Sequence, residues 1–371
     1  MRTLQPRIEG GSALPLLFAL TWAIILLRSL AFGADWNATL AAQYLDGRQK
    51  AWVNWKPAFD DPEGPCISCH TGVPYLMARP ELRLLLSEKG PTEFETTLLD
   101  GLRRRVPLIT PKQYAPNATE SEAAQFLGSE AVLSALLLVA EDRRSGKGMS
   151  PTTEKAFERM WAFQAQTGPG QGAWPWTSLQ LDPWEESESM FHGAALAAAA
   201  AGMAPSGYRQ RPEVNRSVGL LVGYLSSHQK NQPLHHRLTL TWASKHLRGI
   251  LSTEETKRIL DEILSKQEAD GGWTVASLGP WRVREGRPKR QGSDAYATAY
   301  TAYILQAVHR AESGPQLQRA LNWLRSKQDP KDGFWEATSM NKHYTPGTMP
   351  SLFMRDAATA YAVLALTGNG D

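Results

Sequence analysis

The residues with the clearest chemistry form the run Cys66-Ile-Ser-Cys69-His70. These two cysteines are the only ones in the chain, and a histidine follows the second directly. Two thiols at this spacing can add to the two vinyl groups of one porphyrin, and the adjacent histidine then falls over the iron. The run therefore predicts one covalent haem c, held by Cys66 and Cys69, with His70 as the proximal iron ligand.

Three other uses of the two cysteines fit the sequence less well. A thioredoxin-like redox pair follows a strand, whereas residues 60–65 have the composition of a turn. Half a zinc site would need a second pair of ligands, and the chain has no further cysteine. A disulfide across two residues closes too small a loop to stabilise much. Haem attachment is the interpretation that we carry forward.

The second axial ligand of the iron is left open. Met77 lies seven residues after His70, so on one helix both would share a face and the same side of the porphyrin. A five-coordinate haem would favour chemistry or small-ligand binding over simple electron transfer. The candidates for a sixth ligand are otherwise scattered histidines and methionines: His192, His235, His236, His246, His343, Met203, Met340 and Met349.

Residues 1–33 predict an export signal. Arg2 and Arg7 supply a basic start, and the apolar stretch over 13–27 is shorter than the roughly 20 residues of a spanning helix. Cleavage before Ala34 is expected, although Arg28 is atypical and an uncleaved N-terminal anchor is the alternative. Both alternatives place the remainder in the periplasm, and no later segment looks apolar enough to span a membrane.

The charge of the chain gives no reason to expect a nucleic-acid partner. The net formal charge is only +3. The basic runs at 103–105 and 282–290 are expected to be solvated surface.

The C-terminal half contains two copies of one pattern. In each, an amphipathic helix ends in Lys-Gln, an Asp-Gly turn and a tryptophan follow, and an aspartate opens a second, small-residue helix 21 residues later. Weaker copies start near residues 157 and 220, and helices are expected over 40–53 and 71–86 around the haem motif. Such helix pairs must stack to bury their apolar faces, with the small-residue helix inside. The residues of the two clear copies are Gln267, Trp273 and Asp294, and Gln328, Trp335 and Asp356.

The segment Gln267-Glu-Ala-Asp-Gly-Gly-Trp273 resembles the QW motif of triterpene cyclases such as squalene–hopene cyclase. Protein prenyltransferase β subunits share the helix pairing. The resemblance implies an all-α fold, an α/α toroid with inner and outer helical rings and a cavity near the N-termini of the inner helices. It covers residues 150–371 well and 35–145 by analogy. We expect a haem-bearing N-terminal part, 34–145, followed by the repeats, 146–371.

The catalytic groups of those two families are missing. Squalene–hopene cyclase uses an Asp-x-Asp-Asp run, which does not occur here, and Asp294 and Asp356 each stand alone. Prenyltransferases bind zinc through aspartate, cysteine and histidine, and both cysteines are assigned to haem. The chain therefore looks like a hybrid of a c-type cytochrome and a cyclase-like toroid, and the resemblance transfers the fold without either active site.

Four residues are weak candidates for catalysis: Glu188, His192, Asp294 and Asp356. The acidic run 182–188 precedes the helix of His192 and is either a solvated, helix-capping loop or an acidic cluster at the cavity mouth. The stripe Tyr296, Tyr300 and Tyr303 is expected to pack between helices, or to line an apolar pocket.

Together these features predict a periplasmic monohaem protein that transfers electrons or acts as an oxidoreductase on an apolar ligand, with an electron-transfer partner protein. The alternatives are a terpenoid cyclase or mutase with an accessory haem, and a non-catalytic haem sensor or module that binds a lipid or isoprenoid. Because Cys66–His70 lie between an outer helix and its inner partner, we expect the haem edge to face the mouth of the toroid.

Overall fold

The computed structural model of the chain describes residues 36–58, 64–281, 292–308 and 314–368. The predicted export signal over 1–33, most of the turn before the haem motif and the basic run 282–290 lie outside these residues. Within them there are helices and no strand, apart from two isolated bridges. Asn37–Asp371 forms one compact unit, and the expected division near residue 145 stays a prediction.

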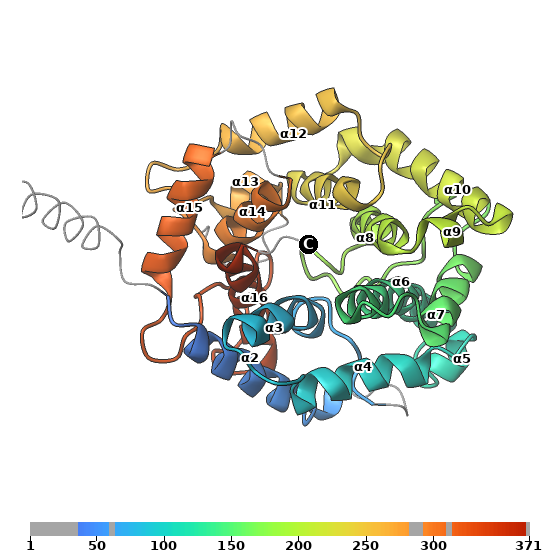
Figure 1. Cartoon of the computed structure of the whole chain (residues 1–371), viewed down its shortest axis with the longest axis horizontal. Coiled ribbons are helices and arrows are strands. Elements are labelled where there is room, and N and C mark those ends of the chain that lie inside the picture. The colour runs from blue at the N-terminus through green and yellow to red at the C-terminus, as the bar shows by residue number, and fades with distance from the viewer. Residues whose placement is uncertain (1–35, 59–63, 282–291, 309–313, 369–371) are drawn as a thin grey trace, which may run out of the picture. The chain divides into compact units, whose positions relative to one another are not determined.

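Helices that are buried on nearly every side form an inner ring within this unit (Figure 1). Each contacts the next along the chain, and the last returns to the first, so the ring is closed. Small residues such as the alanines of α8 allow these helices to approach one another closely. The inner helices are α3 (Gly72–Leu85), α6 (Glu120–Ser145), α8 (Met190–Met203), α11 (Leu234–His246), α14 (Ala295–Ala307) and α16 (Phe353–Thr367).

An outer ring of amphipathic helices packs against the inner one (Figure 1). Most begin at a capping side chain: Thr92, Ser150 and Ser252, for example, each accept a hydrogen bond from a backbone N–H of the first turn. The two rings confirm the prediction of an all-α, α/α toroidal fold. The outer helices are α2 (Ala38–Trp52), α4 (Glu93–Arg105), α7 (Pro151–Ala162), α10 (Pro212–His228), α12 (Thr253–Leu264) and α15 (Gly314–Lys327).

A glutamine at each repeated turn ties one outer helix to the next. Gln267 Nε2 donates to the carbonyl oxygen of Gly271 in its own turn at 2.8 Å and to that of Gln316 in α15 at 2.9 Å. Gln164 makes the corresponding pair of bonds two turns earlier in the chain. Gln328 Nε2 donates to Gly333 and to Asn37, the N-cap of the first described helix, so the same bond closes the outer ring.

The tryptophan after each glutamine fills the space under the turn. Trp174, Trp273 and Trp335 are fully buried, and the indole N–H of each donates to a carbonyl near the end of its own outer helix. The Gln–Trp pattern found in the sequence is therefore a packing device, which agrees with the toroid and needs no catalytic role.

The glycine of the last turn allows the closest approach at the seam of the ring. Gly333 has a φ of +76°, and a Cβ on it would lie 2.4 Å from the backbone carbon of Leu40 in α2. Glycine suits both demands, because it adopts positive φ without strain and carries no side chain.

Helix α6 passes the length and composition test for a membrane span, contrary to our expectation for the later segments. However, 78% of its most apolar window is buried inside the protein, where it contacts α3, α7 and α8. Its apolar sequence is accounted for by its place in the inner ring.

Replacing Gly333 by alanine should destabilise the protein more than the same change at Gly347. Both glycines have φ near +80°, but only Gly333 has backbone within 4 Å of the added Cβ. Gly347→Ala should therefore cost only the backbone penalty of about 1–2 kcal/mol, and Gly333→Ala clearly more. Urea unfolding of the two variants checks this, and equal losses would contradict the assigned close contact at the seam.

Candidate functional site

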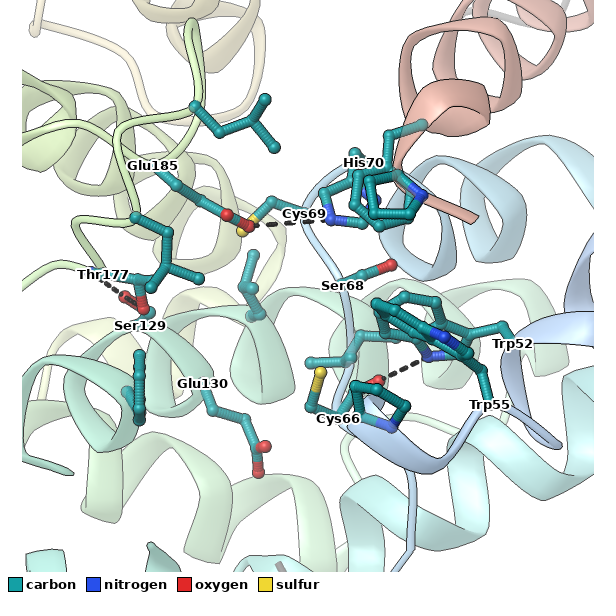
Figure 2. Close-up of a pocket in the computed structure, with 18 of the residues that line it drawn as sticks. Trp52, Trp55, Cys66, Ser68, Cys69, His70, Ser129, Glu130, Thr177 and Glu185 are labelled. Carbon is teal, nitrogen blue, oxygen red and sulfur yellow. Dashed lines mark hydrogen bonds and ion pairs between the residues drawn. The ribbon is translucent and has the colours of Figure 1, made fainter. Parts of the chain in front are cut away.

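The Cys66–His70 loop lines a cavity of about 290 Å³ (Figure 2). Its other walls come from the first half of α6, the loop before α8 and the segment that leads into α16. The cavity thus lies near the N-termini of inner helices, as the resemblance to the triterpene cyclases implied. Aromatic rings make up much of the wall: Trp52, Trp55, Tyr114, Phe126, Tyr344 and Phe353.

Hydrogen bonds on both sides hold this loop in place. The indole N–H of Trp52 donates to the carbonyl oxygen of Cys66 at 3.0 Å. The hydroxyl of Ser68 accepts from the backbone N–H groups of Thr71 and Gly72, at 3.0 and 2.8 Å, and so satisfies donors at the start of α3. Ser68, one of the two residues between the cysteines, therefore fixes the start of α3 directly after His70.

His70 is oriented by a hydrogen-bond chain that leaves one ring nitrogen toward the cavity. Its Nδ1 lies 3.0 Å from the Thr71 hydroxyl, which donates its own proton to Asp356 Oδ2 at 2.9 Å. The hydroxyl must therefore accept from Nδ1–H, which leaves the lone pair on Nε2. Nε2 lies 4.0 Å from Glu185 Oε1 across the cavity. Burial, and secondarily Arg48, lower the pKa of His70 to about 3, so the ring is neutral.

Asp356, a candidate for catalysis, lies behind His70 and does not line the cavity. Its carboxylate accepts hydrogen bonds from Arg48 Nε at 2.7 Å, from the Tyr44 hydroxyl at 2.9 Å and from Thr71. Burial raises the pKa of Asp356, and the Arg48 guanidinium opposes that shift. The residue lies in the first turn of α16, and its role is to join α2, α16 and the His70 loop.

The two cysteines are not joined by a disulfide, and both line the cavity. Burial, followed by the nearby Glu185 carboxylate, raises the pKa of the Cys69 thiol well above its usual value. The Cys69 sulfur lies beside the Glu185 carboxylate (Figure 2).

Two buried glutamates line the cavity: Glu130, which the sequence did not single out, and Glu185, which it included only as part of the acidic run 182–188. Burial raises the pKa of Glu185 to about 7, although the Cys69 hydrogen bond opposes the shift. Glu130 forms ion pairs with Arg105 and Arg159, at 2.9 and 3.6 Å, and accepts from the Tyr114 hydroxyl. The expectation that residues 103–105 are solvated is wrong for Arg105, which is buried and also donates to the carbonyl of Pro65.

The acidic run 182–188 fits each of its two interpretations in part: some of its residues face or lie near the cavity, and one is solvated. Glu185 faces the cavity and Asp182 and Glu186 are buried, while Glu188, the candidate from the sequence, is exposed. Glu188 lines a smaller neighbouring cavity with His236. The acidic run thus reaches the cavity through Glu185, whereas Glu188, the residue singled out in the sequence, lies outside it.

The other candidates lie away from this cavity. Asp294 caps α14, where its Oδ1 accepts from the backbone N–H groups of Tyr296 and Ala297. His192 is buried and lies beside Thr239 in a different, small cavity. The three tyrosines of α14 pack against Tyr361 of α16, as expected for a helix interface.

None of the eight residues proposed as a sixth iron ligand is among the described residues that line the cavity. Met77 also lies outside it, in the small cavity that contains His192. The cavity offers other side chains opposite the loop, among them Glu185, Lys342 and Tyr344. Neither of the last two was singled out in the sequence.

Comparison with known proteins gives matches among solved structures alone. No family model and no curated protein matches the chain. A polysaccharide lyase structure matches with a TM-score of 0.50 and 11% identity, over 90% of this chain and 97% of that one. An α-1,6-mannanase variant from Salegentibacter sp. HEL1_6, in complex with α-1,6-mannotriose, has 0.49 and 10%, over 88% and 100%. A possible GH105 member from Klebsiella pneumoniae has 0.49 and 13%, over 89% and 92%.

The match to the polysaccharide lyase agrees with the fold class that the two rings define, an α/α toroid. The predicted function, a periplasmic haem redox protein on a terpene-cyclase-like toroid, is wrong by this comparison, because the toroid that matches at a TM-score of 0.50 is a polysaccharide lyase. The fold prediction is confirmed at the level of the helical toroid.

Removing the Asp356 carboxylate should strongly destabilise the toroid. Asp356→Ala leaves the buried Arg48 guanidinium without its carboxylate, and breaking a buried pair typically costs about 3–5 kcal/mol. Glu141→Ala removes the half-exposed pair with Arg144 and should cost at most about 1 kcal/mol. Denaturant unfolding of both variants checks the difference. A loss below about 1 kcal/mol for Asp356→Ala would show that this carboxylate does not hold the ring seam.

Proposed function

We propose that the cavity holds one haem c, bound through thioethers to Cys66 and Cys69 with His70 Nε2 as an axial ligand. The observation that carries the proposal is the orientation of His70, whose Nδ1 is engaged by Thr71 while Nε2 faces a cavity lined by both thiols. A histidine that ligates a metal commonly donates its other N–H to such a partner, which fixes ring and tautomer. The proposal concerns the cofactor and does not include the redox role.

The residues around the cavity fit this group. The low pKa of His70 keeps the imidazole neutral, as coordination requires, and aromatic rings offer apolar contact to a porphyrin. Each thiol would add to a vinyl group, forming one S–C bond while the thiol proton passes to the neighbouring vinyl carbon, so no oxidant is consumed. A bound haem would supply an iron centre at the mouth of the toroid. Its location would be the periplasm, reached through the predicted signal in residues 1–33.

Expression of the full chain with its leader, in a bacterial host that matures c-type haem, should give protein that retains one haem after denaturation. Mass spectrometry of the unfolded chain measures the added mass. The Cys66→Ala/Cys69→Ala variant should lose the covalent group, while His343→Ala, at an exposed position, should keep it. Exported, folded protein whose two thiols both react with an alkylating agent would refute the proposal.

A second candidate is cleavage of a glycosidic bond by acid–base chemistry in the same cavity. It is favoured by two buried carboxyl groups on one aromatic-walled cavity. Glu130 forms ion pairs with Arg105 and Arg159, whereas Glu185 forms none with an arginine of the described residues. When two carboxyl groups lie in such different environments, one can remain ionised while the other is protonated and acts as the acid. A polysaccharide lyase is among the toroids that match the fold, and protonation of a leaving sugar oxygen by Glu185 would be the acid step.

Haem-free full-length chain, incubated with a panel of polysaccharides, should release new reducing ends if this second candidate holds. Because the pKa of Glu185 is about 7, the acid is protonated below neutral pH, and the rate should fall as the pH rises above about 7. Glu185→Gln should lower the rate by about 10²-fold or more. The exposed Glu188→Gln should leave it unchanged. No release from any substrate, or equal rates for both variants, would reject this activity.

A further inference from the structure

Three buried histidines meet inside the inner ring, next to the cavity described above. His192 comes from α8, and His235 and His236 come from the start of α11. One ring nitrogen of each lies within 4.8 Å of the corresponding nitrogen of the other two. The ring centroids form a nearly equilateral triangle with sides of 5.3, 5.5 and 5.4 Å.

The outer nitrogens of two of these rings are held by hydroxyl groups. His192 Nδ1 lies 3.0 Å from the Thr239 hydroxyl, and that hydroxyl donates to the carbonyl of His235. The hydroxyl therefore accepts from His192, which leaves the lone pair on His192 Nε2. His235 Nε2 lies 2.8 Å from the Tyr296 hydroxyl.

The second nitrogen of His235 is the strongest indication of a ligand. His235 is fully buried, and its Nδ1 has no hydrogen-bond partner in the described protein. A buried polar atom without a partner destabilises the fold, and a bound ion would remove that cost.

The third ring needs only a small change to take part. His236 Nε2 donates to the carbonyl oxygen of Pro183 at 3.1 Å, whereas Nδ1 lies at a weak 3.4 Å from Gln232 Oε1. Nδ1 can therefore give up the amide contact while the firmer bond to Pro183 keeps the ring in place.

We propose that His192, His235 and His236 form a binding site for a first-row transition-metal ion of the Zn²⁺ type. Three neutral imidazoles with oriented outer nitrogens are a usual ligand set for such ions, and they leave a fourth position for water or a substrate atom. Burial lowers the pKa of each of the three rings below its ordinary value, so no proton has to be displaced near neutral pH.

The surroundings agree with a cation at this position. Glu186 and Glu188 line the small cavity that contains His236, and their carboxylates add negative charge beside the ring. The three histidines do not line the Cys66–His70 cavity but lie near it, since Cys69, Trp184 and His192 line one small cavity in common. The inference does not depend on what fills that first cavity.

The test uses untagged full-length chain that has been stripped by a chelator and dialysed. Titration with Co²⁺ alone should give one ion per chain with the visible spectrum of a four-coordinate site, and Zn²⁺ should displace it. His235→Ala should abolish stoichiometric binding, and the exposed His343→Ala should bind as the parent chain does. Elemental analysis counts cobalt and zinc separately from any iron.

A second variant separates metal binding from folding. Tyr296→Phe keeps the ring and removes only the hydroxyl that orients His235, so it should fold and bind Co²⁺ about 10- to 100-fold more weakly. Zn²⁺ should also raise the Tm of the parent chain and leave that of His235→Ala unchanged. Absence of stoichiometric binding to the parent chain, or unchanged binding by both variants, would overturn the proposal and leave the three histidines as packed core residues.

Discussion

A single buried carboxylate joins the seam of the ring to the candidate cofactor site. Asp356 lies at the start of the last inner helix and binds Arg48 and Tyr44 of the first outer helix. It also accepts from Thr71, which in turn fixes His70. The bonds that close the toroid therefore also orient the one histidine of the Cys-x-x-Cys-His run. Loss of the Asp356 carboxylate would disturb the ring closure and the orientation of His70 together. The buried Arg48 guanidinium at the seam would then have no negative charge beside it.

Repetition explains why much of the fold could be predicted from the sequence. The glutamine, glycine and tryptophan of each turn make the same local bonds in three places, so their spacing identified the helix pairs. The inner helices were recognisable by small apolar residues, and observed α14 and α16 agree with the expected second helices. Helices α4 and α6 were not assigned, because that segment carries no Gln–Trp turn to mark them.

The site was predictable only where it is local in sequence. The run from Cys66 to His70 occupies five consecutive positions of one loop, and that loop lines the cavity. The opposite wall is formed by contacts between distant segments, such as Arg105 with Glu130 and Cys69 with Glu185, and no spacing rule anticipates them. The histidine triangle likewise depends on how α8 packs against α11, so His192 could be named as a candidate without its partners.

The proposed function of the toroid differs from the sequence prediction in one respect: it keeps the haem cofactor and leaves out the redox role. The comparison removed the redox function, while the cavity keeps the residues that covalent haem attachment needs. Iron-edge anomalous diffraction from crystals of the exported, matured protein tests the central proposal most directly. We expect one iron peak at bonding distance from His70 Nε2, with porphyrin density joined to Cys66 and Cys69 inside the cavity. Iron bound elsewhere, or a cavity without porphyrin between intact thiols, would contradict it.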